Sequence, residues 1–150
     1  MTKTIKHKII VPSTNEELEK YYHLRYEILR KRWGQEETTT RDEYENESLH
    51  IMAIDENGNA IATGRLQFNK NNEAQVRSMA VIDEQQKTGL GSELLQYLEN
   101  EAKKRNYTRI VLDARDNAVD FYIKNGYEVE GDSYVLFGVI PHFKMSKSLM

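Results

Sequence analysis

The residues with the clearest chemical meaning are the glycines of Gln86-Lys87-Thr88-Gly89-Leu90-Gly91, which lie between an apolar run and an amphipathic stretch. A glycine-bearing turn at the start of a helix leaves several backbone N–H groups without a partner inside that helix. These donors and the positive end of the helix dipole together bind phosphate or pyrophosphate groups. The segment therefore predicts a site for a phosphate-bearing ligand. The alternative is a helix start that only needs a tight turn.

Two common phosphate loops do not fit this segment. A Walker-type loop needs Gly-Lys-Ser/Thr at the helix start, whereas Gly91 is followed by Ser92 and Glu93. A Rossmann turn directly follows its strand and needs a third glycine where Leu94 stands. Asp113 follows at roughly the spacing of a ribose-binding acid, about twenty residues on, but this one agreement does not offset the two failures.

The remaining pattern is Gln-x-x-Gly-x-Gly, preceded by Ser78–Val81 and followed downstream by the block Asn117–Tyr127. This combination resembles the GCN5-related N-acetyltransferase superfamily, and both ends of the chain are similar to its small bacterial members of uncharacterised substrate. The resemblance implies a single domain over residues 1–150, an α/β fold with a mixed, mostly antiparallel central sheet flanked by helices. The sheet is expected to splay at an acyl-CoA cleft, between strands at Ala74–Val81 and Arg109–Leu112, beside a bulge.

The resemblance also implies a set of residues that bind the acyl donor. Backbone N–H groups of the loop would hold the pyrophosphate of coenzyme A, and Lys87 either approaches the phosphates or is simply solvated. The strand before the loop would pair with the pantetheine amides, and one of its N–H groups would polarise the thioester carbonyl. Asn117 would contact the pantetheine arm, cap a helix, or do both. The full set is Met79, Ala80, Val81, Gln86, Lys87, Thr88, Gly89, Leu90, Gly91, Ser92 and Asn117.

One catalytic residue follows from the same resemblance. Tyr122 matches a tyrosine that donates a proton or hydrogen bond to the departing thiolate, while its neighbour Phe121 is assigned to the core. The general base stays open. Protein acetyltransferases of this superfamily often carry a glutamate where Gln75 stands, and Glu73 is expected in a turn. His142 is either the base or a partly buried structural histidine, and an ordered water or another group is the alternative proton acceptor.

Two features point to opposite charges on the acceptor. The segment Gly34–Glu47 carries Glu36, Glu37, Asp42, Glu43, Glu45 and Glu47 against a single arginine, Arg41. Such a surface attracts a cationic amine, or it is only a solvated acidic loop. Arg65 and Arg77, on adjacent predicted strands, are instead suited to a carboxylate. The sequence does not choose between these alternatives.

Composition narrows the class of protein further. The net charge is −3 and no basic stripe is present, which argues against nucleic acid as a partner. There is no cysteine, so disulfides, thiolate metal sites and a cysteine nucleophile are excluded. The N-terminal segment has no signal-like apolar region and no run approaches a membrane span, so a cytoplasmic protein without membrane contact is expected. We expect no bound metal.

The spacing of apolar residues predicts the helices and strands that position these residues. Ser13-Thr14-Asn15 is expected to cap a first helix that continues to about Arg32. Gly91 begins a second helix that ends near Lys103-Lys104-Arg105, with Leu94, Leu95, Leu98 and Ala102 facing inward, and a third helix covers Asn117–Asn125, capped by Gly126. Strands are predicted at Ile5–Val11, His50–Asp55, Ala60–Phe68, Ala74–Val81, Arg109–Leu112, Tyr134–Gly138 and Phe143–Lys147.

The sequence thus indicates an acyl-CoA-dependent N-acyltransferase that moves an acetyl group from acetyl-CoA to an amine by direct attack. The acceptor is a small-molecule or peptide amine. Two alternatives remain, a non-catalytic coenzyme A-binding sensor or assembly protein, and an acyltransferase that uses a longer acyl donor. Whether the chain forms a homodimer is not determined at this level.

Overall fold

The fold is built on one mixed sheet of seven strands in the order β1-β2-β3-β4-β5-β7-β6. The computed structural model describes residues 5–150, so the first four residues of the N-terminal segment lie outside it. The strands are β1 (His7–Ile10), β2 (Leu49–Asp55), β3 (Ala60–Phe68), β4 (Glu73–Val81), β5 (Arg109–Arg115), β6 (Glu128–Leu136) and β7 (Ile140–Ser148). The helices are α1 (Asn15–Leu29), α2 (Leu90–Lys104) and α3 (Val119–Lys124).

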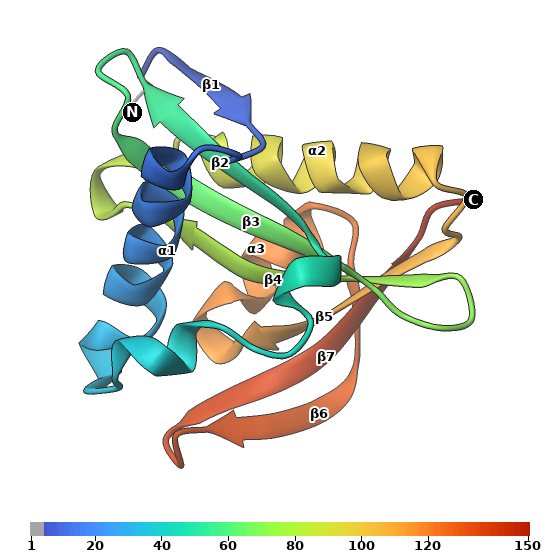
Figure 1. Ribbon diagram of the computed structural model, residues 1–150. Helices are drawn as coiled ribbons and strands as arrows, with labels where there is room; N and C mark the ends of the chain where they lie inside the picture. The colour runs from blue at the N-terminus through green and yellow to red at the C-terminus, as the bar shows by residue number, and fades with distance from the viewer. Residues whose placement is uncertain (1–4) are drawn as a thin grey trace.

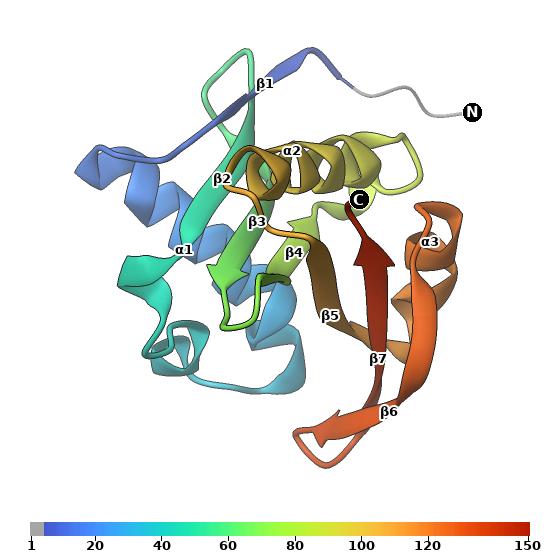
Figure 2. The ribbon, with the colours of Figure 1, turned by 90° about the vertical axis from the view of Figure 1, so that its right-hand side faces the viewer.

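The helices cover both faces of this sheet, α1 on one side and α2 and α3 on the other (Figures 1 and 2). Leu94, Leu95, Leu98 and Ala102 of α2 are fully buried in the core, as their spacing predicts. The mixed, mostly antiparallel sheet with flanking helices confirms the predicted fold class.

The first helix is fixed at its start by a capping box. The Thr14 hydroxyl accepts from the Glu17 N–H at 3.1 Å, and the Glu17 carboxylate accepts from the Thr14 N–H at 3.1 Å. The helix ends at Leu29 rather than Arg32, because Lys31–Trp33 tighten into a 3-10 turn that closes on Gly34 in the left-handed region, with φ at +71°.

The central feature is the divergence of β4 from β5. These two strands are parallel and pair only over Glu73–Gln75, after which β4 continues without β5 beside it. On its other edge β4 carries a bulge, where Ser78 and Met79 together lie opposite Gly64 of β3 and Ser78 takes φ of +54°. The predicted splay and bulge are both confirmed, and they leave backbone groups of β4 facing an open space.

The C-terminal elements differ in length from the sequence prediction. Strands β5, β6 and β7 are all longer than expected, because β7 pairs along its length with β5 on one side and β6 on the other. Residues Glu128–Ser133 lack apolar alternation, so only this pairing identifies them as strand. The third helix is shorter, since a 3-10 turn at Asp116–Ala118 precedes it. Ala118 occupies the N-cap position, so the helix-capping alternative for Asn117 is wrong.

Candidate functional site

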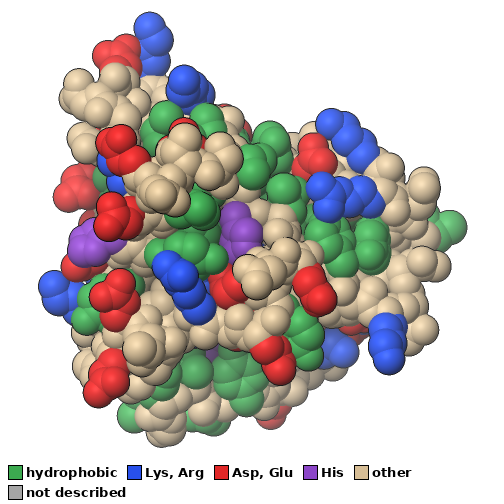
Figure 3. Space-filling model, in the orientation of Figure 1, with side chains coloured by type: hydrophobic (Ala, Val, Ile, Leu, Met, Phe, Trp, Pro, Cys, Tyr) green, Lys and Arg blue, Asp and Glu red, His purple; other side chains and the backbone are tan. Residues whose placement is uncertain are grey.

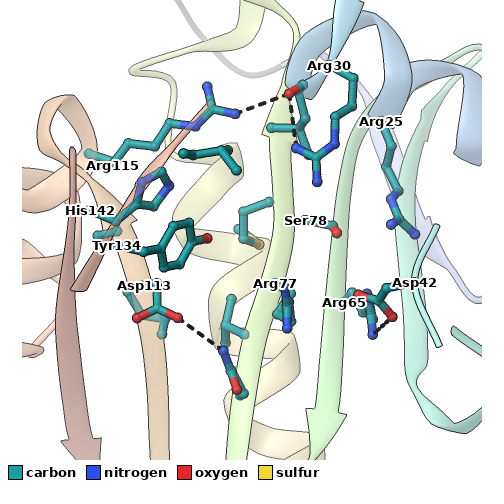
Figure 4. A pocket seen from close by; sticks show the side chains of 18 of the residues that line it. Arg25, Arg30, Asp42, Arg65, Arg77, Ser78, Asp113, Arg115, Tyr134 and His142 are labelled. Atoms are coloured by element: carbon teal, nitrogen blue, oxygen red, sulfur yellow. Dashed lines mark hydrogen bonds and ion pairs between the residues drawn. The ribbon is translucent and has the colours of Figure 1, made fainter. Parts of the chain in front are cut away.

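A cavity of about 240 Å³ opens where β4 leaves β5. It is lined by the end of α1 and the segment after it, by β3 and β4, by β5, by α3 and the turn before it, and by β6 and β7. Figure 4 shows that side chains from these elements converge on this space. The polar and charged residues of the lining are Arg25, Arg30, Thr39, Thr40, Asp42, Arg65, Gln75, Arg77, Ser78, Asp113, Arg115, Tyr122, Tyr134 and His142.

The glycine loop lies at the start of α2. Gly89 is the N-cap residue, with φ of +97°, and it supplies no side-chain cap. The first N–H groups of α2 therefore have no acceptor within the helix or from its cap residue. Gln86 fixes the preceding turn, since its side-chain amide donates to the Val81 carbonyl at 3.3 Å. Lys87 is exposed, also at positive φ.

Close packing of the loop depends on Gly91. An added Cβ at this position would lie 3.2 Å from Cζ of Phe121 and 3.7 Å from a methyl carbon of Val81. At Gly89 nothing lies within 4 Å of such a Cβ. Glycine is therefore favoured at the two positions for different reasons. Gly89 adopts a left-handed backbone conformation and faces open space, whereas Gly91 allows α3 to approach closely.

The strand residues Met79, Ala80 and Val81 extend from the bulge to the loop. Ala80 and Val81 pair with Thr63 and Ala62 of β3, which occupies one edge of the strand. The other edge faces the gap left by β5, so its backbone groups are available to an extended ligand. Met79 also lines the cavity, whereas Asn117 lies outside it on the exposed 3-10 turn before α3.

Tyr122 reaches the cavity from α3. Its side chain is only 7 % exposed, and its ring makes edge-to-face contacts with Phe121 and Tyr127. Burial raises the pKa of its phenol, and the nearby charge of Arg115 opposes that rise. The phenol is therefore protonated across the physiological range, the state that a proton donor needs.

His142 reaches the same cavity from β7, where the ring of Tyr134 stacks on it at 4.5 Å between centroids. Nδ1 lies 2.9 Å from the Ile140 carbonyl, which assigns the proton to Nδ1 and the free lone pair to Nε2 in the neutral ring. Burial lowers the pKa of His142, so the neutral form dominates at pH 7.

The acidic segment after α1 is in part structural. Asp42 and Glu45 both bind Arg65, with N–O distances of 2.8 Å, and Glu45 also binds Arg25 at 2.7 Å. Arg65 is 1 % exposed and Arg25 is 2 % exposed. Arg65 is therefore held within the fold and is not available to an acceptor carboxylate, contrary to the interpretation that paired it with Arg77. Other acidic side chains lie over α1 and the segment after it, on the left of Figure 3.

Sequence reasoning missed several of the polar lining residues as parts of a site, among them Arg30, Asp113, Arg115 and Tyr134. Arg30 ends α1, and the other three lie on β5 and β6. No local pattern marks them, because tertiary pairing of strands distant in the chain brings them together. Gln75 cannot act as a base because its side chain is an amide. That amide donates to Asp113 at 3.4 Å, and its carbonyl oxygen accepts from Asn69 at 3.0 Å.

Comparison with known proteins decides the family. A family model described as the Acetyltransferase (GNAT) family matches residues 18–127. The chain belongs to this family. It is 29 % identical over 140 residues to the uncharacterized N-acetyltransferase YjcF of Bacillus subtilis (strain 168), covering 93 % of this chain and 99 % of YjcF.

Solved structures agree with this fold. An acetyltransferase of the GNAT family from Staphylococcus aureus Mu50 superposes with a TM-score of 0.75 at 18 % identity, covering 96 % of this chain and 99 % of that one. An aminoglycoside 6'-N-acetyltransferase complexed with coenzyme A gives a TM-score of 0.80 at 16 % identity, covering 95 % and 97 %. The GNAT protein is thus an acyl-CoA-dependent N-acyltransferase, and the family predicted from its motifs is confirmed.

Two structural features are absent from residues 5–150. None of their helices has both the length and the apolar character that a membrane crossing requires. Their His, Asp and Glu side chains form no cluster of three or more that could hold a metal ion.

Proposed function

We propose that the protein transfers an acetyl group from acetyl-CoA to a small primary amine, by direct attack of the amine on the thioester. The observation that carries this proposal is the position of Tyr122. The side chain lines the cavity at the divergence of β4 and β5, where a thioester laid along β4 would meet an acceptor. No covalent enzyme intermediate is invoked.

The donor is proposed to bind along β4 and across the start of α2. The pyrophosphate would accept hydrogen bonds from backbone N–H groups of the loop and the first turn of α2, from Lys87 to Ser92. The pantetheine arm would pair with the free edge of Met79–Val81, whose other edge is held by β3. A backbone N–H of this strand would polarise the thioester carbonyl. Asn117, exposed beside α3, would contact the arm from the far side.

Proton transfer is proposed to use two side chains of the cavity. Expulsion of the coenzyme A thiolate requires a donor, and the buried phenol of Tyr122 is protonated and otherwise used only in ring contacts. The attacking amine must lose a proton, and Nε2 of neutral His142 offers a lone pair, directly or through one water. Gln75 cannot take this role.

A thiol-release assay tests the activity. Coenzyme A release from acetyl-CoA is followed with a panel of amino acids, aliphatic amines, polyamines, aminoglycosides and peptides with free N-termini. Turnover with at least one amine and recovery of the acetylated amine are expected. Butyryl-CoA in parallel distinguishes a longer acyl preference.

Calorimetry with coenzyme A accompanies the assay. Binding without turnover on any amine would support the alternative of a coenzyme A sensor or assembly protein. Absence of both binding and turnover would overturn the proposed donor site as well.

A further inference from the structure

Positive charge exceeds negative charge in the lining of the cavity. Five arginines contribute to the lining, and only two aspartates do. Glu45 supplies a third carboxylate from behind Arg25 and Arg65. Five guanidinium groups thus face three carboxylates in a half-enclosed space, where water screens charge less than it does at an open surface.

The lining arginines fall into two groups. Arg25 and Arg65 are neutralised by Glu45 and Asp42. Arg30, Arg77 and Arg115 form no ion pair with any carboxylate of residues 5–150. Their hydrogen-bond acceptors are neutral oxygens, the Gln67 side chain for Arg77 at 3.4 Å, and backbone carbonyls for Arg30 and Arg115. Arg30 and Arg115 also lie over the rings of Phe137 and Trp33, at 5.4 Å and 5.8 Å from the centroids, which are likewise uncharged.

Arg30 and Arg115 are held toward each other despite their like charge. Their guanidinium groups donate to the same Leu29 carbonyl, at 3.2 Å and 3.4 Å. Figure 4 shows this shared contact above the cavity, with Arg77 below it on β4. Burial lowers the pKa of Arg30, and the nearby charges of Arg115, Arg25 and Arg77 lower it further. A cluster of cations without a directly paired carboxylate among residues 5–150 is electrostatically unfavourable, and binding of an anion would relieve this repulsion.

Binding of an anion explains the positions of these three arginines better than an ordinary role as solvated surface residues does. All three are partly buried, and each comes from a different part of the fold, the C-cap of α1, β4 and β5. Solvated arginines usually extend away from one another, whereas these converge on one cavity. A guanidinium group presents paired N–H donors that match the oxygens of a carboxylate or a phosphate.

Asp113 contributes a negative charge to the same cavity. It lies on the opposite side of the cavity from Arg65 and Asp42, beside Tyr134 (Figure 4). Its oxygens accept from Ser133 at 2.7 Å and from Gln75 at 3.4 Å, and it forms no ion pair with an arginine or lysine of the described residues. It is therefore able to attract the ammonium group of an incoming amine.

We propose that the acceptor is a small primary amine that also carries an anionic group, a carboxylate or a phosphate, held by Arg30, Arg77 and Arg115. This inference rests on the proposed function, because it names the acceptor class of the same site. The cavity volume of about 240 Å³ is below the range of about 300–1,000 Å³ usual for drug-sized ligands. An acceptor the size of an amino acid fits, whereas a large polycation does not.

The test compares amines that differ only at the far end of one carbon chain. γ-Aminobutyrate ends in a carboxylate, butylamine in a methyl group and putrescine in a second ammonium group, while aminopropylphosphonate supplies a phosphate-like end. We expect kcat/KM to be about 10- to 100-fold higher for the better anionic amine than for butylamine, and lowest for putrescine. The carboxylate and phosphonate arms identify which anion is preferred.

Variants assign the preference to the arginines. Arg30→Gln, Arg77→Gln and Arg115→Gln should each reduce the anionic preference about 10-fold or more, with little change for butylamine. Arg77→Lys should restore part of it. Arg105→Gln is the matched control, because Arg105 lies outside the cavity over the ring of Phe68. Affinity for coenzyme A, measured by calorimetry, shows that each variant is folded.

The outcomes separate the two proposals. Turnover without anionic preference, or a preference that survives all three substitutions, overturns the acceptor assignment and leaves the acetyltransferase activity standing. If no amine is acetylated, calorimetric titration of γ-aminobutyrate and butylamine into the coenzyme A complex still tests the site. Equal or undetectable binding of both would then contradict the inference.

Discussion

Phe121 packs so closely on Gly91 that a side chain there would require the ring to shift, since an added Cβ would lie 3.2 Å from the ring. This contact joins the glycine loop and the block Asn117–Tyr127, the two motifs that carry the resemblance to acetyltransferases. The loop is thereby positioned by the same helix that carries Tyr122. Donor binding and proton donation depend on one packing arrangement.

Substitution of the loop glycines should therefore weaken coenzyme A binding for two separable reasons. Gly91→Val forces the Phe121 ring away, whereas Gly89→Ala strains a left-handed backbone at a cost of about 1–2 kcal/mol and places a methyl group where the phosphates would lie. We expect at least about a 10-fold loss of affinity by calorimetry in each case. Gly58→Ala, with φ of +79° in the β2–β3 hairpin, is the control for backbone strain alone. Unchanged affinity in both loop variants would refute the assigned pyrophosphate site.

Tyr122→Phe should lower turnover far more than donor affinity. The substitution keeps the buried ring contacts with Phe121 and Tyr127 but removes the proton donor to the thiolate. We expect kcat to fall by about 100-fold or more, the usual range for loss of a general acid, with KM for acetyl-CoA changed little. Tyr107→Phe, outside the cavity, controls for loss of a hydroxyl. A normal rate in the Tyr122 variant would remove the tyrosine from the mechanism.

His142→Gln should change the pH profile as well as the rate. Burial lowers the pKa of His142 below the ordinary 6.5, so the neutral, proton-accepting ring persists to lower pH than usual. The ratio of wild-type to variant kcat/KM cancels the ionisation of the amine. This ratio should be constant above pH 6.5 and fall as pH drops through the lowered pKa. His23→Gln, on the exposed face of α1, is the control. A ratio near unity at every pH would favour a water relay as the base.

The elements of the proposed donor half of the site are predictable from sequence because each motif is local. A glycine loop, the strand before it and the tyrosine block each lie within a short segment, and each keeps its expected place in the fold. The proposed acceptor half is not local. Arg30, Arg77 and Arg115 come from distant parts of the chain, and only the pairing order of the sheet brings them together. From sequence alone Arg65 is a candidate for the acceptor site, because no sequence pattern indicates that Asp42 and Glu45 neutralise it within the fold.

Glu45 should be the most important single carboxylate for stability. It is buried and binds Arg25 and Arg65 together, while its oxygens also accept from Tyr22 at 3.1 Å. Glu45→Gln leaves two buried guanidinium groups undercompensated, so the free energy of unfolding should fall by about 3–5 kcal/mol. Chemical denaturation measures this change. Glu47→Gln, at an exposed position in the same segment, should alter stability by no more than about 0.5 kcal/mol. Equal effects of the two substitutions would contradict the network.

The loss of folding stability at acid pH should depend on Asp42. Partial burial opposes its ionisation, but hydrogen bonds and charge from Arg65 outweigh this and lower the pKa of Asp42 to about 2, from an ordinary 3.8. The ionised carboxylate thus stabilises the folded state fully above pH 3.8, and this contribution is lost as pH falls from 3.8 towards 2. Asp42→Asn lacks the titration, so its free energy of unfolding should be lower than wild type near pH 6 and should decline less over the acid range. Denaturation curves at several pH values measure both slopes. Burial opposes the ionisation of Glu45, but Arg25 and Arg65 outweigh this and lower its pKa. The stability of the Asp42 variant should therefore still depend on pH to some extent in the acid range. Parallel slopes for the two proteins would show that the Asp42–Arg65 pair does not contribute to acid stability.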